Sequence, residues 1–197
     1  MSIARRKIRF EESSNEILIR CLRKDDFTEW NDWRIDNENR RISLKGARLV
    51  NVNLAGADFS RIDLEAADLN HTNLSGADLS EANLTIADLS NANLCGADLW
   101  KADMKHANLR QADLKRAQLV KANLENAQLV RIHLESADLW KANLKGAKLI
   151  LITVDRRTFI WGCDVDERTV IHGTNLNLAR IEPCLMERMK VESGVRL

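Results

Sequence analysis

Residues 73–100 read NLSGADLSEANLTIADLSNANLCGADLW, a five-residue phrase that recurs with changes mainly in its polar letters. Counting from Leu44, every fifth residue up to Leu149 is apolar, and 20 of these 22 positions are leucine. The residue two places earlier is alanine in 17 of the 22 units, and the residue between them is Asp or Asn in 16. No insertion breaks the spacing, so the units must form one continuous repeat structure.

A five-residue period fits neither a regular helix nor a flat strand. On an α-helix the leucines would spiral around the axis, and on a strand successive leucines would point to opposite faces. Within one unit, however, Ala and Leu are two residues apart and share a face if that stretch is extended. The chain must therefore turn once per unit, which predicts a solenoid lined by Leu and Ala. The interposed Asp or Asn suits such turns, because its side chain bonds the local backbone.

The units ANLTI, ADLSN, ANLCG and ADLWK also resemble those of pentapeptide-repeat proteins, notably cyanobacterial ones, and the resemblance covers residues 42–151. It implies an all-β solenoid in which four units close one square coil, a right-handed quadrilateral parallel β-helix. The 22 units would then make about five to six coils, in a column roughly 25 Å long at a coil spacing of ~4.8 Å.

Flanking segments are expected to cover the open ends of the column with short α-helical caps. In the first of them, Phe27, Trp30, Trp33 and Ile35 are predicted to plug the first coil. The expected organisation is a basic tail over 1–12, a helical N-terminal cap over 13–41, the repeat β-helix over 42–151, a degenerate final coil over 152–180, and a C-terminal helix or tail over 181–197.

Two features near the C-terminus support the last two of these segments. VDRRTFIWG (154–162) and VDERTVIHG (165–173) duplicate each other at an offset of 11 residues, which suggests a degenerate coil. Residues 182–193 place apolar Leu185, Met186 and Met189 at the spacing of a short helix, which either caps the column or pairs two chains.

Composition excludes several classes of function. The net charge of +1 gives no bulk attraction to nucleic acid or a membrane surface, and the apolar runs are too short to span a bilayer. The N-terminal MSIARRKIRF is basic without a following apolar region, unlike a secretory signal. The four cysteines are scattered, as expected of reduced thiols. These features predict a cytoplasmic protein that does not bind membranes.

Nothing in the repeats suggests catalysis. Leu and Ala would fill the interior and leave no pocket for a substrate or cofactor. Residues that stack on successive coils differ by 20, and no two of the four histidines do: His71, His106, His133 and His172. We therefore expect a protein that is not an enzyme and has no catalytic, cofactor-binding or metal-binding residues.

One pair of outward columns stands out when residues 20 apart are read together. Ser60, Ser80, Trp100, Val120 and Trp140 form one column, and Arg61, Glu81, Lys101, Lys121 and Lys141 form its neighbour. Trp100, Val120, Trp140, Lys101, Lys121 and Lys141 are the candidate partner-binding residues. Three interpretations stay open: surface aromatics supported by lysine stems, a contact surface for another protein or a second copy, and, least favoured, stacking of single-stranded nucleic acid.

An acidic column offers a rival interpretation. Asp58, Asp78, Asp98 and Asp138 recur at 20-residue intervals with Gln118 between them, and either bond turns or imitate DNA phosphates. Some pentapeptide-repeat proteins are acidic rods that occupy the DNA site of type II topoisomerases. Here residues 42–100 carry 8 acids and 3 bases (net −5), whereas 101–151 carry 5 acids and 10 bases (net +5), so the expected rod has an electrical polarity instead of one sign.

The sequence thus predicts a non-catalytic repeat scaffold that presents flat walls to an unidentified protein partner. A homodimer through the C-terminal helix or the tryptophan column is a further possibility. A DNA-mimicking regulator that binds DNA gyrase or another topoisomerase is the alternative.

Overall fold

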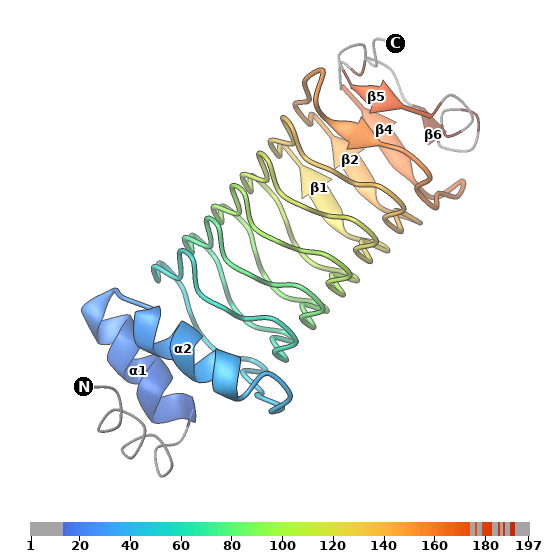
Figure 1. The fold of residues 1–197 in the computed structure, drawn as a ribbon. Coiled ribbons are helices and arrows are strands. Elements are labelled where there is room, and N and C mark those ends of the chain that lie inside the picture. Colours follow the sequence, from blue (N-terminus) through green and yellow to red (C-terminus); the bar gives the residue numbers. More distant parts are fainter. Residues whose placement is uncertain are drawn as a thin grey trace.

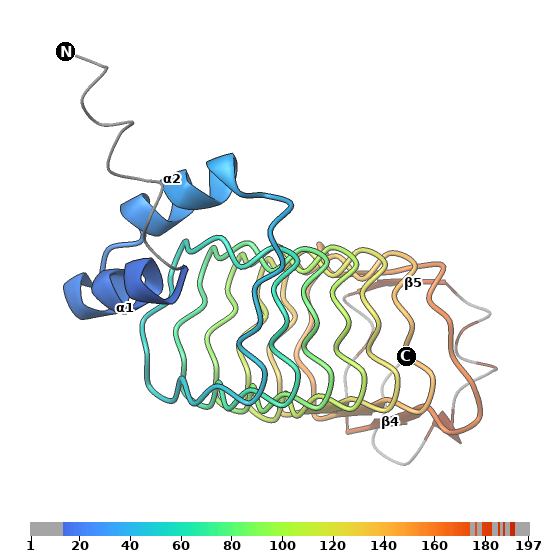
Figure 2. The same ribbon diagram turned by 90° about the horizontal axis from the view of Figure 1, so that it is seen from below.

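The protein is an elongated column of stacked coils with two helices at its N-terminal end (Figures 1 and 2). The computed structural model describes residues 14–173, 176, 179–182, 185, 187, 190 and 191. The predicted basic tail over 1–12 lies outside the described residues.

Parallel pairing between residues 20 apart builds the column. Ser43 pairs with Asp63, which pairs with Asn83, and the same offset continues to Asn143. Each of the four walls is one such ladder. This arrangement confirms the right-handed quadrilateral parallel β-helix.

Some rungs are long enough to be strands. A four-stranded parallel sheet has the order β1 (Gln128–Val130), β2 (Lys148–Ile150), β4 (Val170–His172) and β6 (Lys190–Val191). On another wall β3 (Phe159–Ile160) pairs with β5 (Arg180–Ile181).

The corners of the column are hydrogen-bonded turns with a left-handed third residue. In the turn from Leu44 to Ala47 the Ala47 N–H donates to the Leu44 carbonyl at 2.9 Å, and Gly46 has φ +66°. Non-glycine residues take the same conformation in other units, including Ile86 at φ +53°. The Asp or Asn of each unit supports the turn that follows, as where Asn53 Oδ1 accepts from the Ala55 N–H at 3.2 Å. This geometry explains the order of residues in each unit. A small residue follows the turn, an Asp or Asn side chain accepts from the next turn, and an apolar residue points inward.

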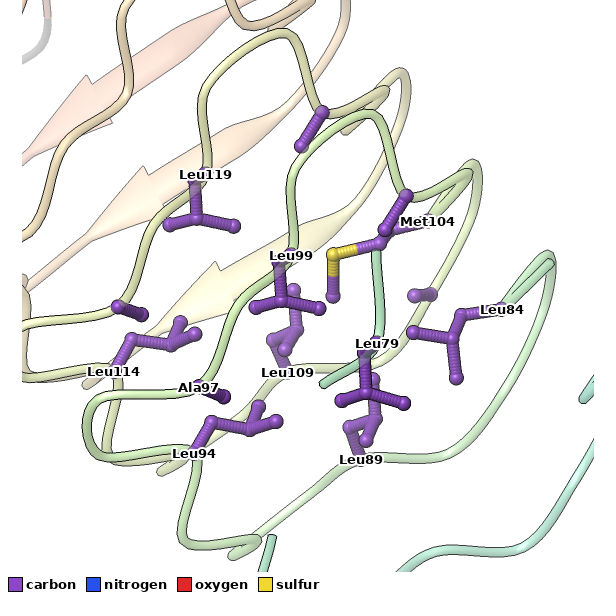
Figure 3. Close-up of a cluster of buried hydrophobic side chains, with 14 of the residues drawn as sticks. Leu79, Leu84, Leu89, Leu94, Ala97, Leu99, Met104, Leu109, Leu114 and Leu119 are labelled. Carbon is purple, nitrogen blue, oxygen red and sulfur yellow. The ribbon is translucent and has the colours of Figure 1, made fainter. Parts of the chain in front are cut away.

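The interior is a continuous stack of leucine side chains. Leu79, Leu84, Leu89 and Leu94 come from successive walls of one coil and converge on its centre (Figure 3), where all four are fully buried. The next coil repeats the pattern, with Met104 at one leucine position. From Ala57 to Ala147 the inward alanines of the units are also buried, so Leu and Ala fill the interior of these coils.

Two helices cover the first coil: α1 (Ser14–Lys24) and α2 (Thr28–Asp36). Trp30 is fully buried and its ring centroid lies 5.8 Å from that of Phe59 in the column. Phe27 and Trp33 are also buried, as expected. The expectation for Ile35 is wrong, because its side chain is 74% exposed.

Side chains of α2 form hydrogen bonds with the backbone of the first coil along one wall, where no earlier coil pairs with it. Asn31 accepts from the Asp58 N–H and donates to the Gly56 carbonyl, both at 2.8 Å. Trp30 Nε1 donates to the Asp58 carbonyl at 2.7 Å, and buried Arg34 donates to the Ser60 carbonyl at 2.6 Å. These bonds satisfy backbone groups that an exposed sheet edge would leave open to another chain.

The period lengthens after Val154. Asp138 pairs with Phe159 at an offset of 21, and Lys148 pairs with Val170 at 22. The two added residues fall in the turns that begin at Asp155 and Asp166, each of which closes on a buried threonine. The duplicated segments therefore continue the column, and each adds one unit of six residues instead of five.

The C-terminal segment departs from the expectation of a helix over 182–193. Leu185 and Glu187 are helical, but β6 at Lys190–Val191 is a strand that pairs with β4. At Lys190–Val191 the backbone pairing with β4 outweighs the helical preference predicted from the spacing of the apolar residues.

Candidate functional site

The backbone fixes the tryptophan and lysine columns side by side. The Lys101 N–H donates to the Val120 carbonyl at 3.0 Å, and the Lys121 N–H donates to the Trp140 carbonyl at 2.9 Å. Trp100, Val120 and Trp140 therefore occupy the same corner of successive coils. The three lysines follow them at the left-handed turn position, with φ between +54° and +60°.

The structure extends this column by a residue that the 20-residue period misses. Lys141 N–H donates to the Trp161 carbonyl at 2.9 Å, so Trp161 stands one coil beyond Trp140. Counting 20 residues from Trp140 leads instead to Ile160, which is buried. The extra residue in the turn after Val154 causes the shift, and the 11-residue offset of the two duplicated segments was the signal that could have revealed it. The aromatic–lysine strip is hereafter Trp100, Val120, Trp140, Trp161, Lys101, Lys121 and Lys141.

The indole rings of the strip are partly open to solvent and carry lysine ammonium groups. Trp140 is 37% exposed and Trp161 is 42% exposed. Lys101 Nζ lies 4.0 Å from the Trp100 ring centroid, and Lys141 Nζ lies 4.4 Å from that of Trp140, both within cation–π range. Phe159 stacks on Trp161 with centroids 6.2 Å apart. The strip is thus a row of ordered aromatic groups along one corner, with positive charge beside each of two rings.

The acidic column lies directly beside the strip and supports it. Asp98 Oδ1 accepts from the Trp100 N–H at 2.9 Å, and Asp138 Oδ1 does the same for Trp140. Asp58 and Asp78 make the equivalent bonds to serine N–H groups, and Asp58 also lies 3.5 Å from buried Arg34. Each of the four carboxylates therefore has a local role in a turn.

Outside the strip and the acidic column, the shifted pKa values also have structural causes. Burial raises the pKa of the Cys163 thiol to about 12, and Sγ donates to the Leu139 carbonyl at 3.0 Å. A thiol with such a pKa is protonated at neutral pH and is a poor nucleophile. Cys21, Cys95 and Cys163 are all free thiols.

The described residues hold no cluster of three or more His, Cys, Asp or Glu that could bind a metal ion. Over the same part of the chain, neither helix has both the length and the apolar character needed to cross a bilayer.

Comparison with known proteins identifies the repeats. The model for pentapeptide repeats matches residues 43–85 and 87–126 in eight copies. No protein of curated function gave a significant match.

Several solved structures of pentapeptide-repeat proteins are similar to this chain. HetL from the cyanobacterium Nostoc sp. strain PCC 7120, involved in heterocyst differentiation regulation, is 25% identical over 83% of this chain and 88% of its own, with a TM-score of 0.37. The alr5209 protein, also from Nostoc, is 27% identical over 81% and 91% of the two chains, with a TM-score of 0.43.

QnrB1, a plasmid-mediated fluoroquinolone resistance protein, is 20% identical over 72% of this chain and 70% of its own, with a TM-score of 0.46. Together with the 20-residue pairing and the leucine interior, the matched repeats give the classification. Residues 43–85 and 87–126 of the chain are pentapeptide repeats, and the chain is similar to pentapeptide-repeat proteins.

Proposed function

We propose that this protein is a non-catalytic scaffold that binds a protein partner through the aromatic–lysine strip. The observation that carries the proposal is the alignment of Trp100, Trp140 and Trp161 along one corner, with Trp140 and Trp161 more than one-third exposed. Tryptophan is enriched among the residues that dominate binding energy at protein interfaces. A row of partly exposed indoles on otherwise polar walls is the kind of surface that such interfaces use.

The rigidity of the column supports this role. Every strip residue sits in a turn that is hydrogen-bonded to the next coil, and the lysines lie over two of the rings. A partner therefore meets side chains that lose little conformational freedom on binding, which lowers the entropic cost of association. The filled interior leaves binding on the outer walls as the activity that the fold serves best.

We place this interaction in the cytoplasm. The described cysteines Cys21, Cys95 and Cys163 are free, and free thiols are typical of a reducing compartment.

A type II topoisomerase bound by DNA mimicry is the alternative, favoured by the stacked acidic column. Such a partner would need acidic charge along the whole rod, whereas residues 101–151 carry ten bases and five acids. The turn-bonding role of Asp98 and Asp138 also accounts for those carboxylates without a DNA site.

The repeat supplies conservative variants for the test. Ser60 and Ser80 occupy the strip's column in earlier coils, so Trp100→Ser, Trp140→Ser and Trp161→Ser place a residue that the corner already accepts. The matched control is Cys95→Ser, because Ser75 stands at the equivalent corner one coil earlier. Wild type, the triple variant and the control are used to capture partners from lysate, and the recovered protein is then purified for a binding titration.

The proposal predicts that the purified partner binds wild type and Cys95→Ser equally, and that the triple variant loses at least about tenfold in affinity, the size expected for a hot-spot residue. Equal binding by the triple variant would exclude the strip. Binding of a purified topoisomerase that depends on the acidic column would support the alternative. Sedimentation of wild type beside the triple variant tests whether the partner is a second copy.

A further inference from the structure

A second surface lies at the diagonally opposite corner of the column. It is a groove of about 670 Å³, lined by side chains from four successive coils: Ser90, Asn91, Asn108, Arg110, Gln111, Val130, Arg131, Ile150 and Leu151. Each coil has four turns, counted from the one that follows Leu44. The groove lies at the second turn of each coil, and the strip lies at the fourth. The two surfaces therefore do not share residues, and the inference below does not depend on the function proposed for the strip.

The residues that line the groove change from polar to apolar along the column. Ser90 and Asn91 stand at one end, Arg110 and Gln111 come next, then Val130 and Arg131. Ile150 and Leu151 stand at the other end. At a coil spacing of about 4.8 Å, the polar and apolar ends are about 14 Å apart.

The two arginines carry uncompensated charge. Among the described residues neither Arg110 nor Arg131 has a carboxylate within salt-bridge distance, and no acidic residue lines the groove. Asp88, on the adjoining wall, has its Oδ1 engaged by Ser90 and by Asn108. A guanidinium group is well suited to bidentate binding of a carboxylate.

The apolar end is partly open to solvent, with the Leu151 side chain lying over Gly173 of the next coil. Leu151 is 44% exposed although it occupies a left-handed turn position, φ +53°, that favours glycine or asparagine. The column of the same turn holds Asn91 and Gln111 in earlier coils. A half-exposed leucine in that conformation, beside Ile150, adds apolar surface outside the buried core.

The backbone of the groove is fixed in the same way as that of the strip. The Gln111 N–H donates to the Val130 carbonyl at 2.9 Å, and the Arg131 N–H donates to the Ile150 carbonyl at 2.8 Å. Asn70 closes the polar end by donating to the Ser90 carbonyl at 2.9 Å. The groove is therefore a built surface whose floor does not need to rearrange on binding.

We propose that this groove binds an extended acidic peptide segment of a protein partner, with a carboxylate at Arg110 and Arg131 and an apolar side chain at Ile150 and Leu151. In an extended chain, side chains two residues apart lie on the same face about 6.6 Å from each other. A Glu-X-Leu segment would thus place its carboxylate between the arginines while its leucine covers the apolar end. An open groove with half-exposed walls suits a peptide better than a small molecule, which needs an enclosing pocket.

The test uses the full chain and three synthetic peptides. The probe is GSESLSG with an acetylated N-terminus and an amidated C-terminus. With the same blocked ends, GSQSLSG lacks the carboxylate and GSESSSG lacks the apolar side chain. Binding is followed by NMR titration of the backbone amides up to a few millimolar peptide. The proposal predicts that GSESLSG shifts the amides of Gln111, Arg131 and Leu151, and that either change to the peptide weakens binding at least about fivefold, as for a lost charged or apolar anchor.

The repeat again provides variants that its own corners accept. Arg110→Ser copies Ser90, and Arg131→Gln copies Gln111, each from one coil earlier. Either variant should lose at least about tenfold in affinity, as expected when one partner of a charged contact is removed. The control Arg116→Gly removes one positive charge at another corner, copies Gly96, and should bind like wild type.

Three results would overturn the proposal. One is absence of any amide shift at the groove with GSESLSG. A second is equal binding by Arg110→Ser, Arg131→Gln and wild type. The third is binding of anionic phosphatidylserine vesicles that depends on Arg110 while the peptide does not bind, because this would assign the groove to a lipid surface.

Discussion

Asp138 Oδ1 accepts a hydrogen bond from the Trp140 backbone N–H at 2.9 Å, so the acidic column holds the turn that presents the tryptophan. Asp98 and Trp100 have the same relationship. The two columns that look separate in the sequence are therefore one structural unit. A carboxylate in this position serves the interaction surface by ordering it.

Replacing Asp138 with glutamine should loosen that unit without unfolding the protein. Gln118 occupies the preceding coil, where its side chain donates to the Arg116 carbonyl at 3.4 Å instead of capping the next turn. Asp138→Gln should lower stability by about 1 kcal/mol, a typical hydrogen-bond contribution, or roughly 2–4 °C in Tm for a chain of this size. Thermal unfolding gives the Tm, and a change in tryptophan emission reports on the ring. An unchanged Tm and spectrum would show that the carboxylate does not order the turn.

Ile86 is a position where the fold tolerates strain. It has φ +53° and a 52% exposed side chain, and a β-branched residue is poorly suited to this left-handed conformation. Asn126 holds the same corner two coils later at φ +58°. Ile86→Asn should therefore stabilise the protein by about 1 kcal/mol, the scale of the left-handed penalty. Differential scanning calorimetry measures the Tm of the variant and of wild type. A lower Tm for Ile86→Asn would contradict this interpretation.

Asn31 should matter more to the N-terminal end than its exposure suggests. Its amide bonds both the Asp58 N–H and the Gly56 carbonyl, which are groups of the open β edge. Asn31→Ala should cost about 1–3 kcal/mol, since two backbone groups lose their partner. The control is Asn39→Ala, because the Asn39 side chain makes a single weak bond of 3.4 Å to Glu38 among the residues that the structure describes. Urea unfolding of both variants checks this, and equal midpoints would mean that water replaces the amide without cost.

Asp155 should make stability fall in acid. Desolvation raises the pKa of its carboxyl, but hydrogen bonds from the side chain and N–H of Ser136, from the Arg157 N–H and from the Thr158 hydroxyl outweigh it and lower the pKa to about 2. The folded pKa is below the ordinary value of 3.8, so this stabilisation is present above pH 3.8 and is lost as the pH falls toward 2.

The measurement compares the Tm of wild type and Asp155→Ala between pH 6 and pH 2. The difference should be about 2–4 °C at pH 6 and should shrink below pH 3.8. Arg156→Ala changes an exposed residue of the same turn and should give a difference that does not vary in that way. A constant difference for Asp155→Ala would mean that its charge does not contribute.

The sequence was sufficient for the regular part of the column because its pattern is local. A strict five-residue spacing of Leu and Ala predicts both the inward face and the position of each turn. The coil of four units that the family resemblance implies then predicts the pairing of Ser43 with Asp63 and the stacking of Trp100 on Val120. The prediction fails where the spacing changes. Trp161 escaped notice because one added residue after Val154 moves it into the place that Ile160 would take.

Other features depend on tertiary contacts that spacing does not encode. Ile35 is as apolar as its neighbours, but it lies on the side of α2 that faces away from the column. The groove at Arg110 and Arg131 requires the absence of a carboxylate partner on adjacent walls, which emerges only when all four walls are placed together. Its columns of Arg110, Val130 and Ile150 were nonetheless readable by the same 20-residue count.

The ladder that joins Ser43 to Asp63, and each coil to the next, runs along the long axis of the molecule. Tension applied to the two ends along that axis loads the hydrogen bonds between coils in series, so the column should peel one coil at a time instead of resisting as a sheared sheet. Each released coil would free about 20 residues, or at most roughly 65–70 Å of extended chain. A scaffold of this kind therefore resists compression by its partners far better than stretching.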